Sequence, residues 1–133
     1  MDKRERQCIL LVEDDHFIRE IVQTLLETEG YKVITANNGQ EALDQLSSSP
    51  RPCLILLDLM MPVMNGIEFL ERLRGHGNNE VAMIPVIVTS AIEDDTGTTS
   101  RLASKVLNKP IELEVLLRVV EERCGSPGFR VDQ

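Results

Sequence analysis

Residues 54–62 of the chain are LILLDLMMP, an apolar run of strand length that ends on one carboxylate, Asp58, just before a turn. A central strand of a parallel sheet is buried on both faces and is therefore continuously hydrophobic. In open α/β sheets, ligand sites form beyond the carboxyl ends of the strands. The stretch predicts a buried central strand with Asp58 at such an end, although an aspartate in this position can also simply cap a turn or a helix.

The remainder of the chain has the composition of a single globular domain. Its 133 residues are enough for one core and too few for two. The apolar content of 42% and charged content of 27% are typical of a soluble protein. No apolar stretch approaches the length of a membrane span, and no signal peptide is visible. We expect one domain over residues 1–124 and a flexible tail over residues 125–133.

Charge and cysteine content narrow the function classes further. The formal net charge is −8, from 22 acidic and 14 basic residues, which argues against nucleic-acid binding by this domain. The three cysteines, Cys8, Cys53 and Cys124, are odd in number and lack metal-ligand spacing. We therefore expect reduced thiols in a cytoplasmic protein.

Strand-like and helix-like segments alternate along the chain, which predicts a parallel α/β sheet. The strands are expected at residues 8–12, 31–36, 54–58, 85–90 and 105–108. Apolar residues at helical spacing follow each of the first three strands and the last one. The simplest architecture is a five-stranded sheet with helices on both faces and right-handed crossovers.

The segment 92–104 departs from this regular pattern. It contains DDTGTTS at residues 94–100, a composition that favours caps and turns over helix interiors. We expect the fourth helix to be short or irregular, with about two turns.

Polar side chains stand at the carboxyl ends of four of the predicted strands, namely Glu13-Asp14-Asp15, Asp58, Ser90 and Lys109. Parallel strands bring such ends to one edge of the sheet, so a single crevice could collect them. Clustered carboxylates repel one another unless a cation relieves them. A site made of oxygen ligands without His or Cys suits Mg²⁺.

A carboxylate next to Mg²⁺ can attack a phosphoryl group and form an aspartyl phosphate. In that chemistry Lys109 would neutralise one phosphate oxygen and the Ser90 hydroxyl would donate a hydrogen bond to another. Phosphoryl transfer depends mainly on such positioning and charge neutralisation. The residues are therefore consistent with Asp58 as a phosphoryl acceptor.

The pattern resembles the receiver domain of bacterial two-component response regulators. The resemblance covers residues 8–124 and rests on four elements that occur in the same order: Val12-Glu13-Asp14, Leu57-Asp58-Leu59-Met60-Met61-Pro62 with Asn65-Gly66, Val88-Thr89-Ser90-Ala91, and Lys109-Pro110. It implies a flavodoxin-like, doubly wound α/β fold with the strand order 2-1-3-4-5.

The resemblance also implies a role for individual residues. Asp58 would accept the phosphoryl group from a histidine kinase, and Glu13, Asp14, Asp58 and the backbone carbonyl of Met60 would bind Mg²⁺. Lys109 would contact the phosphate, and its peptide bond to the following proline is often cis in this family.

The switch hydroxyl of the family matches Ser90, five residues after Pro85, better than it matches Thr89. Three positions before the phosphate-contacting lysine, where many receivers carry an aromatic side chain, this chain has Val106. Coupling through an aromatic rotamer is thus absent at that position, whereas a loop shift driven by Ser90 remains available.

Two polar residues near the first strand have simpler explanations than catalysis. Asp15 is placed to begin the first helix, where its charge is favoured by the helix dipole, and we prefer this to metal ligation. His16 is expected to lie exposed at the start of the same helix.

We expect a signalling switch and not an enzyme. Its partners would be a sensor histidine kinase or phosphotransfer protein, and a downstream protein or fused output domain, with a second copy of the chain as a further candidate. One alternative is a receiver-like interaction module that is not phosphorylated. The other is a Mg²⁺-dependent phosphohydrolase with Asp58 as nucleophile, which is disfavoured because Met60 stands where such enzymes carry a second acid.

Overall fold

The chain folds into a five-stranded parallel sheet in the order β2-β1-β3-β4-β5, in a computed structural model that describes residues 8–48, 51–59, 64–90 and 97–125. The strands are β1 (Cys8–Val12), β2 (Lys32–Ala36), β3 (Leu54–Asp58), β4 (Val86–Ser90) and β5 (Lys105–Asn108). The helices are α1 (His16–Thr28), α2 (Gly39–Ser48), α3 (Gly66–Arg74), α4 (Asn79–Ala82), α5 (Thr98–Leu102) and α6 (Leu113–Cys124). The predicted fold class and strand order are confirmed.

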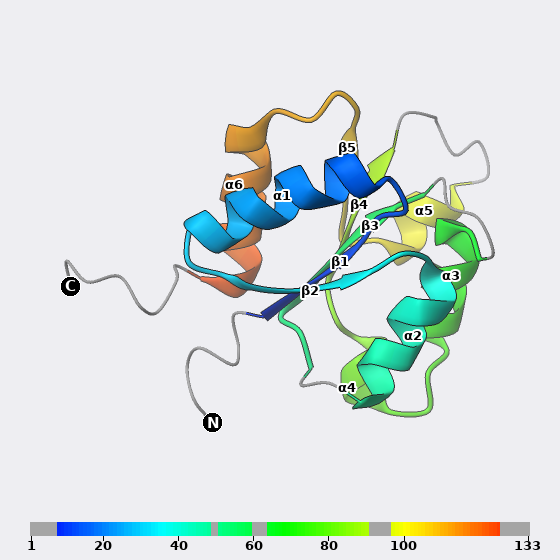
Figure 1. Cartoon of the computed structure of the whole chain (residues 1–133). Helices are drawn as coiled ribbons and strands as arrows, with labels where there is room; N and C mark the ends of the chain where they lie inside the picture. The colour runs from blue at the N-terminus through cyan, green and yellow to red at the C-terminus, as the bar shows by residue number, and fades with distance from the viewer. Residues whose placement is uncertain (1–7, 49–50, 60–63, 91–96, 126–133) are drawn as a thin grey trace.

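Two hydrophobic cores lie on opposite faces of the sheet. Helices α1 and α6 pack on one face, and α2, α3, α4 and α5 pack on the other (Figure 1). Every residue of β1 and β3 is buried, since alternate side chains enter the two cores. Leu56, for example, belongs to the core under α1 and α6, whereas Leu57 belongs to the other. The apolar run that predicted β3 is explained by this double burial.

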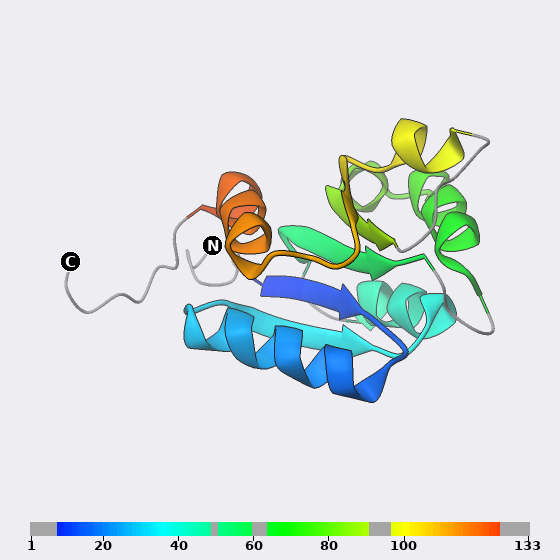
Figure 2. The ribbon, with the colours of Figure 1, turned by 90° about the horizontal axis from the view of Figure 1, so that it is seen from above.

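The strands end together at one edge of the sheet. The arrows of β1, β2 and β3 point the same way in Figure 2. The register pairs Val12 with Leu57, Asp58 with Thr89, and Ser90 with Asn108. The residues that follow these positions are therefore brought to a common edge, as the sequence pattern predicted.

Polar caps fix the starts of two helices near this edge. The Asp15 carboxylate accepts a hydrogen bond from the Ile18 amide at 3.1 Å, which confirms its predicted role at the start of α1. His16 is the first residue of α1 and is exposed, also as predicted. The Asn65 side chain caps α3 in the same manner, with the Glu68 amide as donor at 2.9 Å.

The region between α3 and β5 matches the prediction in part. Helix α5 is short, as expected, while residues 92–96 of the predicted segment lie outside the described residues. Helix α4 was not predicted. The signal for it was Asn78, whose side chain accepts from the Glu80 amide at 2.9 Å and caps the single turn.

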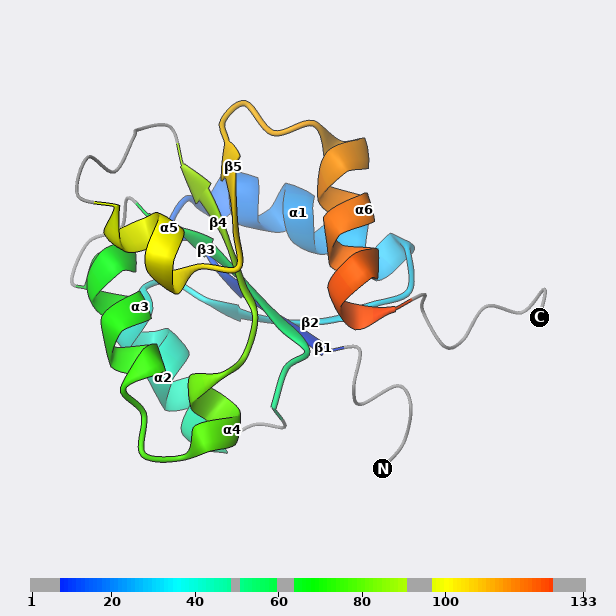
Figure 3. The same ribbon diagram turned by 180° about the vertical axis from the view of Figure 1, so that it is seen from behind.

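The prediction of three reduced thiols was wrong for two of the cysteines. Cys53 and Cys124 form a disulfide with a Cα–Cα distance of 5.5 Å, and Cys8 is free and buried. The last turn of α6 lies next to the amino-terminal ends of β1 and β3 (Figure 3), which places residue 124 beside residue 53 although 71 positions separate them. Sequence spacing does not reveal such a contact, because it depends on how α6 packs.

The predicted boundary between a domain at 1–124 and a tail at 125–133 remains a prediction. Residues 1–7 and 126–133 lie outside the described part of the chain. No helix within the described ranges has the length and apolar character needed to cross a membrane.

Candidate functional site

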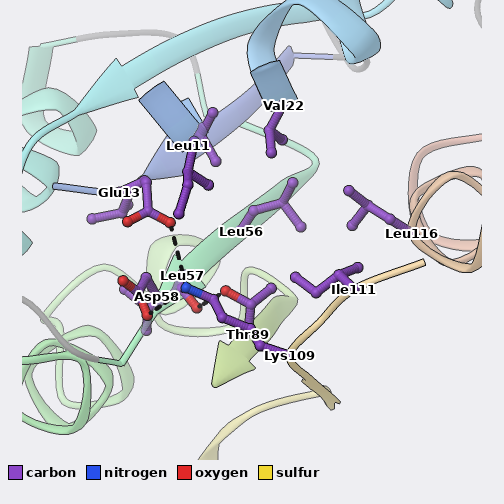
Figure 4. A pocket seen from close by; sticks show the side chains of 12 residues that line it. Leu11, Glu13, Val22, Leu56, Leu57, Asp58, Thr89, Lys109, Ile111 and Leu116 are labelled. Atoms are coloured by element: carbon purple, nitrogen blue, oxygen red, sulfur yellow. Dashed lines mark hydrogen bonds and ion pairs between the residues drawn. The ribbon is translucent and has the colours of Figure 1, made fainter. Parts of the chain in front are cut away.

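Lys109, Glu13 and Asp58 come together at the carboxyl edge of the sheet. Glu13 directly follows β1, Asp58 ends β3, and Lys109 directly follows β5. The Lys109 Nζ lies 3.5 Å from Asp58 Oδ1 and 3.9 Å from Glu13 Oε1. Figure 4 shows the lysine ammonium between the two carboxylates. Three of the residues predicted from the sequence thus form one contiguous cluster.

Asp14 completes an acidic group with Glu13 and Asp58. One carboxylate oxygen from each of these residues lies within 4.8 Å of the others, close enough to share one cation. Glu13 and Asp58 are buried, whereas Asp14 is exposed to solvent. Asp15 is outside this group because its carboxylate caps α1. The oxygen donors and the open side at Asp14 fit Mg²⁺, which binds one or two carboxylates and retains several waters.

The backbone around Glu13 is held on several sides. Its amide donates to the Ala36 carbonyl at 3.1 Å, and its own carbonyl accepts from Arg19 Nη1 at 2.9 Å. The Glu13 carboxylate accepts from the Asp15 amide at 3.2 Å. These contacts fix the acidic turn between β1 and α1 and so orient the carboxylates toward the end of β3.

The pKa of Glu13 is raised from 4.5 to about 7, mainly by burial and in addition by the charge and hydrogen bond of the nearby Asp58. The Asp15 amide and the Lys109 ammonium oppose this rise. At neutral pH and without a metal, the Glu13 carboxyl therefore holds a proton for a substantial part of the time. A bound divalent cation would replace that proton, which is a further reason why the site fits Mg²⁺.

The end of β4 contributes two buried hydroxyl residues, Thr89 and Ser90. The Thr89 Oγ1 donates to the Leu57 carbonyl at 3.5 Å, so this hydroxyl is engaged with the backbone of β3. The Ser90 carbonyl accepts from the Lys109 amide at 2.8 Å, which joins the ends of β4 and β5. No structural role for Thr89 was predicted from the sequence. The structure pairs Thr89 with Asp58 on the neighbouring strand, which explains why its hydroxyl reaches the backbone of β3.

The backbone after Asp58 is held against β4 and α3. The Leu59 amide donates to the Thr89 carbonyl at 3.3 Å, and the Leu59 carbonyl accepts from the Gly66 amide at 3.0 Å. A Cβ added to Gly66 would lie 2.7 Å from the Leu59 Cα, so only glycine fits at this approach. Met60, whose carbonyl was expected to bind Mg²⁺, lies outside the described residues.

A small cavity lies beneath the charged cluster, with a volume of about 30 Å³. Glu13, Asp58, Thr89 and Lys109 line its polar part. Apolar side chains from β1, β3, α1, α6 and the loop before α6 line the rest, as Figure 4 shows for Val22, Leu56 and Ile111. Its volume is close to that of one water molecule in the liquid, so the cavity itself holds no organic substrate. The reacting group must therefore approach from the solvent side, where Asp14 is exposed.

The peptide bond between Lys109 and Pro110 is cis, as the resemblance implied.

Arg19 was not singled out from the sequence. Its guanidinium holds the Glu13 carbonyl through Nη1 and lies 3.1 Å from His16 Nδ1 through Nη2. A basic residue six positions after a strand-end acid, in the first turn of the following helix, is the pattern that could have revealed this contact.

Comparison with protein families gives one match over most of the chain. The model of the response regulator receiver domain matches residues 9–121. Among whole proteins, a transcriptional regulatory protein of Haemophilus influenzae, the CpxR homolog, is 41% identical over 129 residues, which cover 92% of this chain and 54% of that protein. The response regulator MprA of Mycobacterium tuberculosis is 38% identical over 112 residues, covering 82% of this chain and 46% of MprA. The chain therefore spans about half the length of these two relatives.

Solved structures of similar fold cover nearly the whole chain. The signal receiver domain of a histidine kinase from Syntrophus aciditrophicus has a TM-score of 0.78 and 33% sequence identity, and the match covers 94% of each chain. The receiver domain of a sensor histidine kinase from Pseudomonas aeruginosa was solved with a magnesium ion coordinated in the active site cleft. It has a TM-score of 0.78 and 27% identity, with 90% of this chain and 98% of that chain covered.

Proposed function

The chain belongs to the response regulator receiver family, and from this membership we propose that Asp58 is its Mg²⁺-dependent phosphoryl acceptor. Phosphorylation by a histidine kinase is the role of this family. The observation that carries the assignment to Asp58 is its position as the buried end of β3, 3.5 Å from the Lys109 ammonium and within one acidic group with Glu13 and Asp14.

The proposed reaction transfers a phosphoryl group to a carboxylate oxygen of Asp58. That oxygen attacks phosphorus on a phosphohistidine or an acyl phosphate, the bond from phosphorus to the donor atom breaks, and a mixed anhydride forms at Asp58. The Lys109 ammonium lies beside the nucleophile as a counter-charge, while the raised pKa of Glu13 lets that residue hold a proton until a cation arrives. Glu13, Asp14 and Asp58 would hold Mg²⁺, which would neutralise the phosphoryl oxygens when bound.

We propose that Lys109 and Ser90 contact the phosphoryl group once it is attached to Asp58. The Lys109 ammonium is already at ion-pair distance from Asp58 and would stay close to the new phosphoryl oxygens, where a charge-assisted hydrogen bond is strong. The Ser90 hydroxyl would donate to another oxygen, since Thr89 donates to the Leu57 carbonyl. The backbone carbonyl of Met60 is proposed as a further ligand of Mg²⁺.

Phosphorylation adds a charge of about −1.5 to −2 at Asp58. Movement of Ser90 and Lys109 toward that charge would pull on the ends of β4 and β5, which are joined by the bond from the Lys109 amide to the Ser90 carbonyl. We propose that the surface formed by α5, β5 and α6 changes as a result and binds the downstream partner. Val106 in β5 is half-buried and packs against the hydrophobic core that contains Val86 and Val88 of β4. Because this residue is a valine, the proposed route does not use the rotation of an aromatic side chain.

The partners of the chain and its location in the cell are part of the same proposal. Receiver domains interact with histidine kinases and with output domains, and we propose both as partners, the second either fused to residues 1–124 or separate. We place the reaction in the cytoplasm, where ATP supplies kinases with phosphoryl groups. The chemistry serves signalling, with slow self-hydrolysis of the anhydride by the same residues.

Incubation with acetyl phosphate and Mg²⁺, followed by intact-mass measurement, tests the proposal. The wild type is expected to gain the mass of one phosphoryl group, and Asp58→Asn is expected to gain none. Asp44→Asn, an exposed aspartate on α2, is the matched control and is expected to behave like the wild type. Absence of any gain in the wild type would instead support the alternative of an interaction module that is not phosphorylated.

A further inference from the structure

The Cys53–Cys124 disulfide lies at the end of the sheet opposite the acidic cluster. Cys53 immediately precedes β3, and Cys124 is the last residue of α6. Both side chains are half-buried, and Gly125 next to Cys124 is exposed, so a small molecule can reach the bond. The loop that the bond closes is long, because the two cysteines have a sequence separation of 71.

The same backbone accommodates the reduced form of Cys53. Its Sγ lies 3.3 Å from the Cys8 carbonyl oxygen, so a thiol at this position has a hydrogen-bond acceptor already in place. The Cys53 amide also donates to that carbonyl, at 2.9 Å, and this backbone bond does not involve sulfur. Breaking the disulfide thus leaves the start of β3 paired with β1 and leaves no buried polar group without a partner at Cys53.

The third cysteine is poorly suited to take part in exchange. Cys8 is 1% exposed, and burial raises the pKa of its thiol. The thiolate is the reactive form of cysteine, and a buried thiol with a raised pKa rarely adopts it. Exchange is therefore confined to Cys53 and Cys124.

The disulfide helps to hold the C-terminal end of α6 in place. Within the described residues, a hydrogen bond from the Tyr31 hydroxyl to the Gly125 carbonyl, at 2.9 Å, holds the same end. The middle of α6 is held by Leu116, Val119 and Val120 in the core. Loss of the covalent link leaves the last turn of the helix attached by this neutral hydrogen bond and by the packing of Cys124 against the core.

We propose that Cys53 and Cys124 form a reversible redox site that exchanges with small-molecule dithiols and disulfides and thereby sets how firmly the C-terminal turn of α6 is held. Disulfides in cytosolic proteins are usually transient and serve catalysis or redox sensing. This inference uses the cytoplasmic location in the proposed function but not the phosphorylation of Asp58.

Reduction of the Cys53–Cys124 disulfide by a dithiol takes place in two steps. A thiolate of the dithiol attacks one sulfur of the disulfide, the Sγ–Sγ bond breaks, and a mixed disulfide forms while the other cysteine takes up a proton. The second thiol of the dithiol then closes a cyclic disulfide and releases the remaining cysteine. Two electrons and two protons pass from the dithiol to the protein. Oxidation reverses this balance, with a small-molecule disulfide as the acceptor of both electrons.

The effect reaches the functional site through α6. Leu116 and Ile111 line the small cavity whose polar wall holds Glu13 and Asp58. Both residues lie on the segment that runs from Lys109 into α6, the helix whose last turn the disulfide holds. The redox state is therefore connected to the charged cluster by packed side chains.

The experiment counts thiols and measures melting temperature in the full chain, purified without reductant. After equilibration with glutathione disulfide, the denatured wild type is expected to show only the Cys8 thiol. Treatment of the native protein with dithiothreitol should expose all three thiols and lower Tm by on the order of 10 °C, given the long closed loop. Cys8→Ala should show the same Tm shift, whereas Cys53→Ser and Cys124→Ser should show none.

Hydrogen exchange at the end of α6 gives the structural readout. In the wild type, reduction is expected to increase exchange at the Gly125 amide and its neighbours in the last turn, with no change in β1 or β3. Three free thiols in the oxidised wild type would overturn the proposal. A disulfide that resists dithiothreitol in the native protein would also overturn it. The same holds for a Tm shift of equal size in the Cys→Ser variants, or for amide hydrogen exchange in α6 that does not change when reductant is added. None of these readouts depends on phosphoryl transfer, so a failure here leaves the assignment of Asp58 untouched.

Discussion

The Lys109 ammonium faces two carboxylates, at 3.5 Å from Asp58 and 3.9 Å from Glu13. One lysine can neutralise only one of them, and burial, together with the neighbouring Asp58, raises the pKa of Glu13. Asp58 is the carboxylate nearer to Lys109, and it is the one we propose as nucleophile. The division of roles between the two buried acids thus follows from their surroundings.

Removing the cation beside Asp58 should slow the proposed reaction. Lys109→Ala is expected to lower the rate of phosphorylation by acetyl phosphate by about a hundredfold, because a donor aimed at developing negative charge is lost. The rate is measured from a time course of intact mass. Lys105→Ala removes an exposed lysine of β5 and serves as the control. Equal rates for the two variants would contradict the role of Lys109.

The raised pKa of Glu13 predicts a pH dependence of stability in the absence of metal. Because the folded carboxyl binds its proton more tightly than the unfolded one, folding takes up a proton between pH 4.5 and about 7, and stability falls as pH rises through this window. The loss amounts to about 3 kcal/mol at most. Urea denaturation of the wild type in EDTA at pH 5 and pH 8 measures it.

Glu13→Gln removes the titrating group and provides the comparison. The variant should gain stability relative to the wild type at pH 8, and the gain should shrink toward pH 5. Glu114→Gln, at an exposed position of α6, should follow the wild type at both pH values. A wild-type stability that rises from pH 5 to pH 8, with Glu13→Gln parallel to it, would show that Glu13 is ionised in the folded protein.

At the scale of elements, the start of α3 determines where the end of β3 lies. The Gly66 amide donates to the Leu59 carbonyl at 3.0 Å, and an added Cβ would lie 2.7 Å from the Leu59 Cα and 3.1 Å from the Asp58 carbonyl oxygen. These neighbours are backbone atoms, which cannot turn aside as a flexible side chain would. The fit of α3 against Leu59 therefore holds the backbone of Asp58 in place.

Gly66→Ala is expected to destabilise the protein by about 1–3 kcal/mol, because the backbone must shift to admit the methyl group. It should also slow phosphorylation of Asp58, since the shift occurs next to the acceptor. Gly77→Ala is the control, because nothing lies within 4 Å of an added Cβ there, and it should change stability by less than about 0.5 kcal/mol. The measurements are urea denaturation and the acetyl phosphate time course. A Gly66→Ala variant as stable as Gly77→Ala would contradict the close approach.

Most elements were predictable because each leaves a local pattern in the sequence. The strands β1, β3 and β4 are fully buried and so appear as apolar runs, and the residues after them reach one edge because the sheet is parallel. Helix α4 spans four residues, which is too short to show a helical period. Helix α5 was expected to be short from its Thr- and Ser-rich composition, and Thr98–Leu102 is short.

At the scale of the whole molecule, long-range packing produced what the sequence did not predict. The Cys53–Cys124 bond depends on where α6 ends, which no spacing between the cysteines encodes. The elevated pKa of Glu13 depends on burial that the chain creates only when α1 and the segment after β5 close over it. Sequence patterns predicted which groups gather at the sheet edge, whereas their burial and distances required the packed structure.

Binding of Mg²⁺ to the acidic cluster should stabilise the whole fold. A ligand that binds only the folded state at 100 times its Kd adds about 2.7 kcal/mol to the free energy of unfolding. The wild type should therefore show a Tm that rises with Mg²⁺ concentration at pH 8, where the Glu13 proton is easily displaced, and rises less at pH 5.5. Asp14→Asn should require more Mg²⁺ for the same rise, and Asp44→Asn should not. A Tm that is independent of Mg²⁺ would argue against a metal site at this edge.

The most direct test of the central claim identifies the residue that carries the phosphoryl group. After phosphorylation by acetyl phosphate and Mg²⁺, borohydride reduction converts an aspartyl phosphate to homoserine, and peptide mass spectrometry locates the converted residue. The assignment predicts conversion at Asp58 in the wild type and none in Asp58→Asn. Conversion at Asp14 or elsewhere, or a phosphorylated protein with Asp58 unchanged, would contradict it.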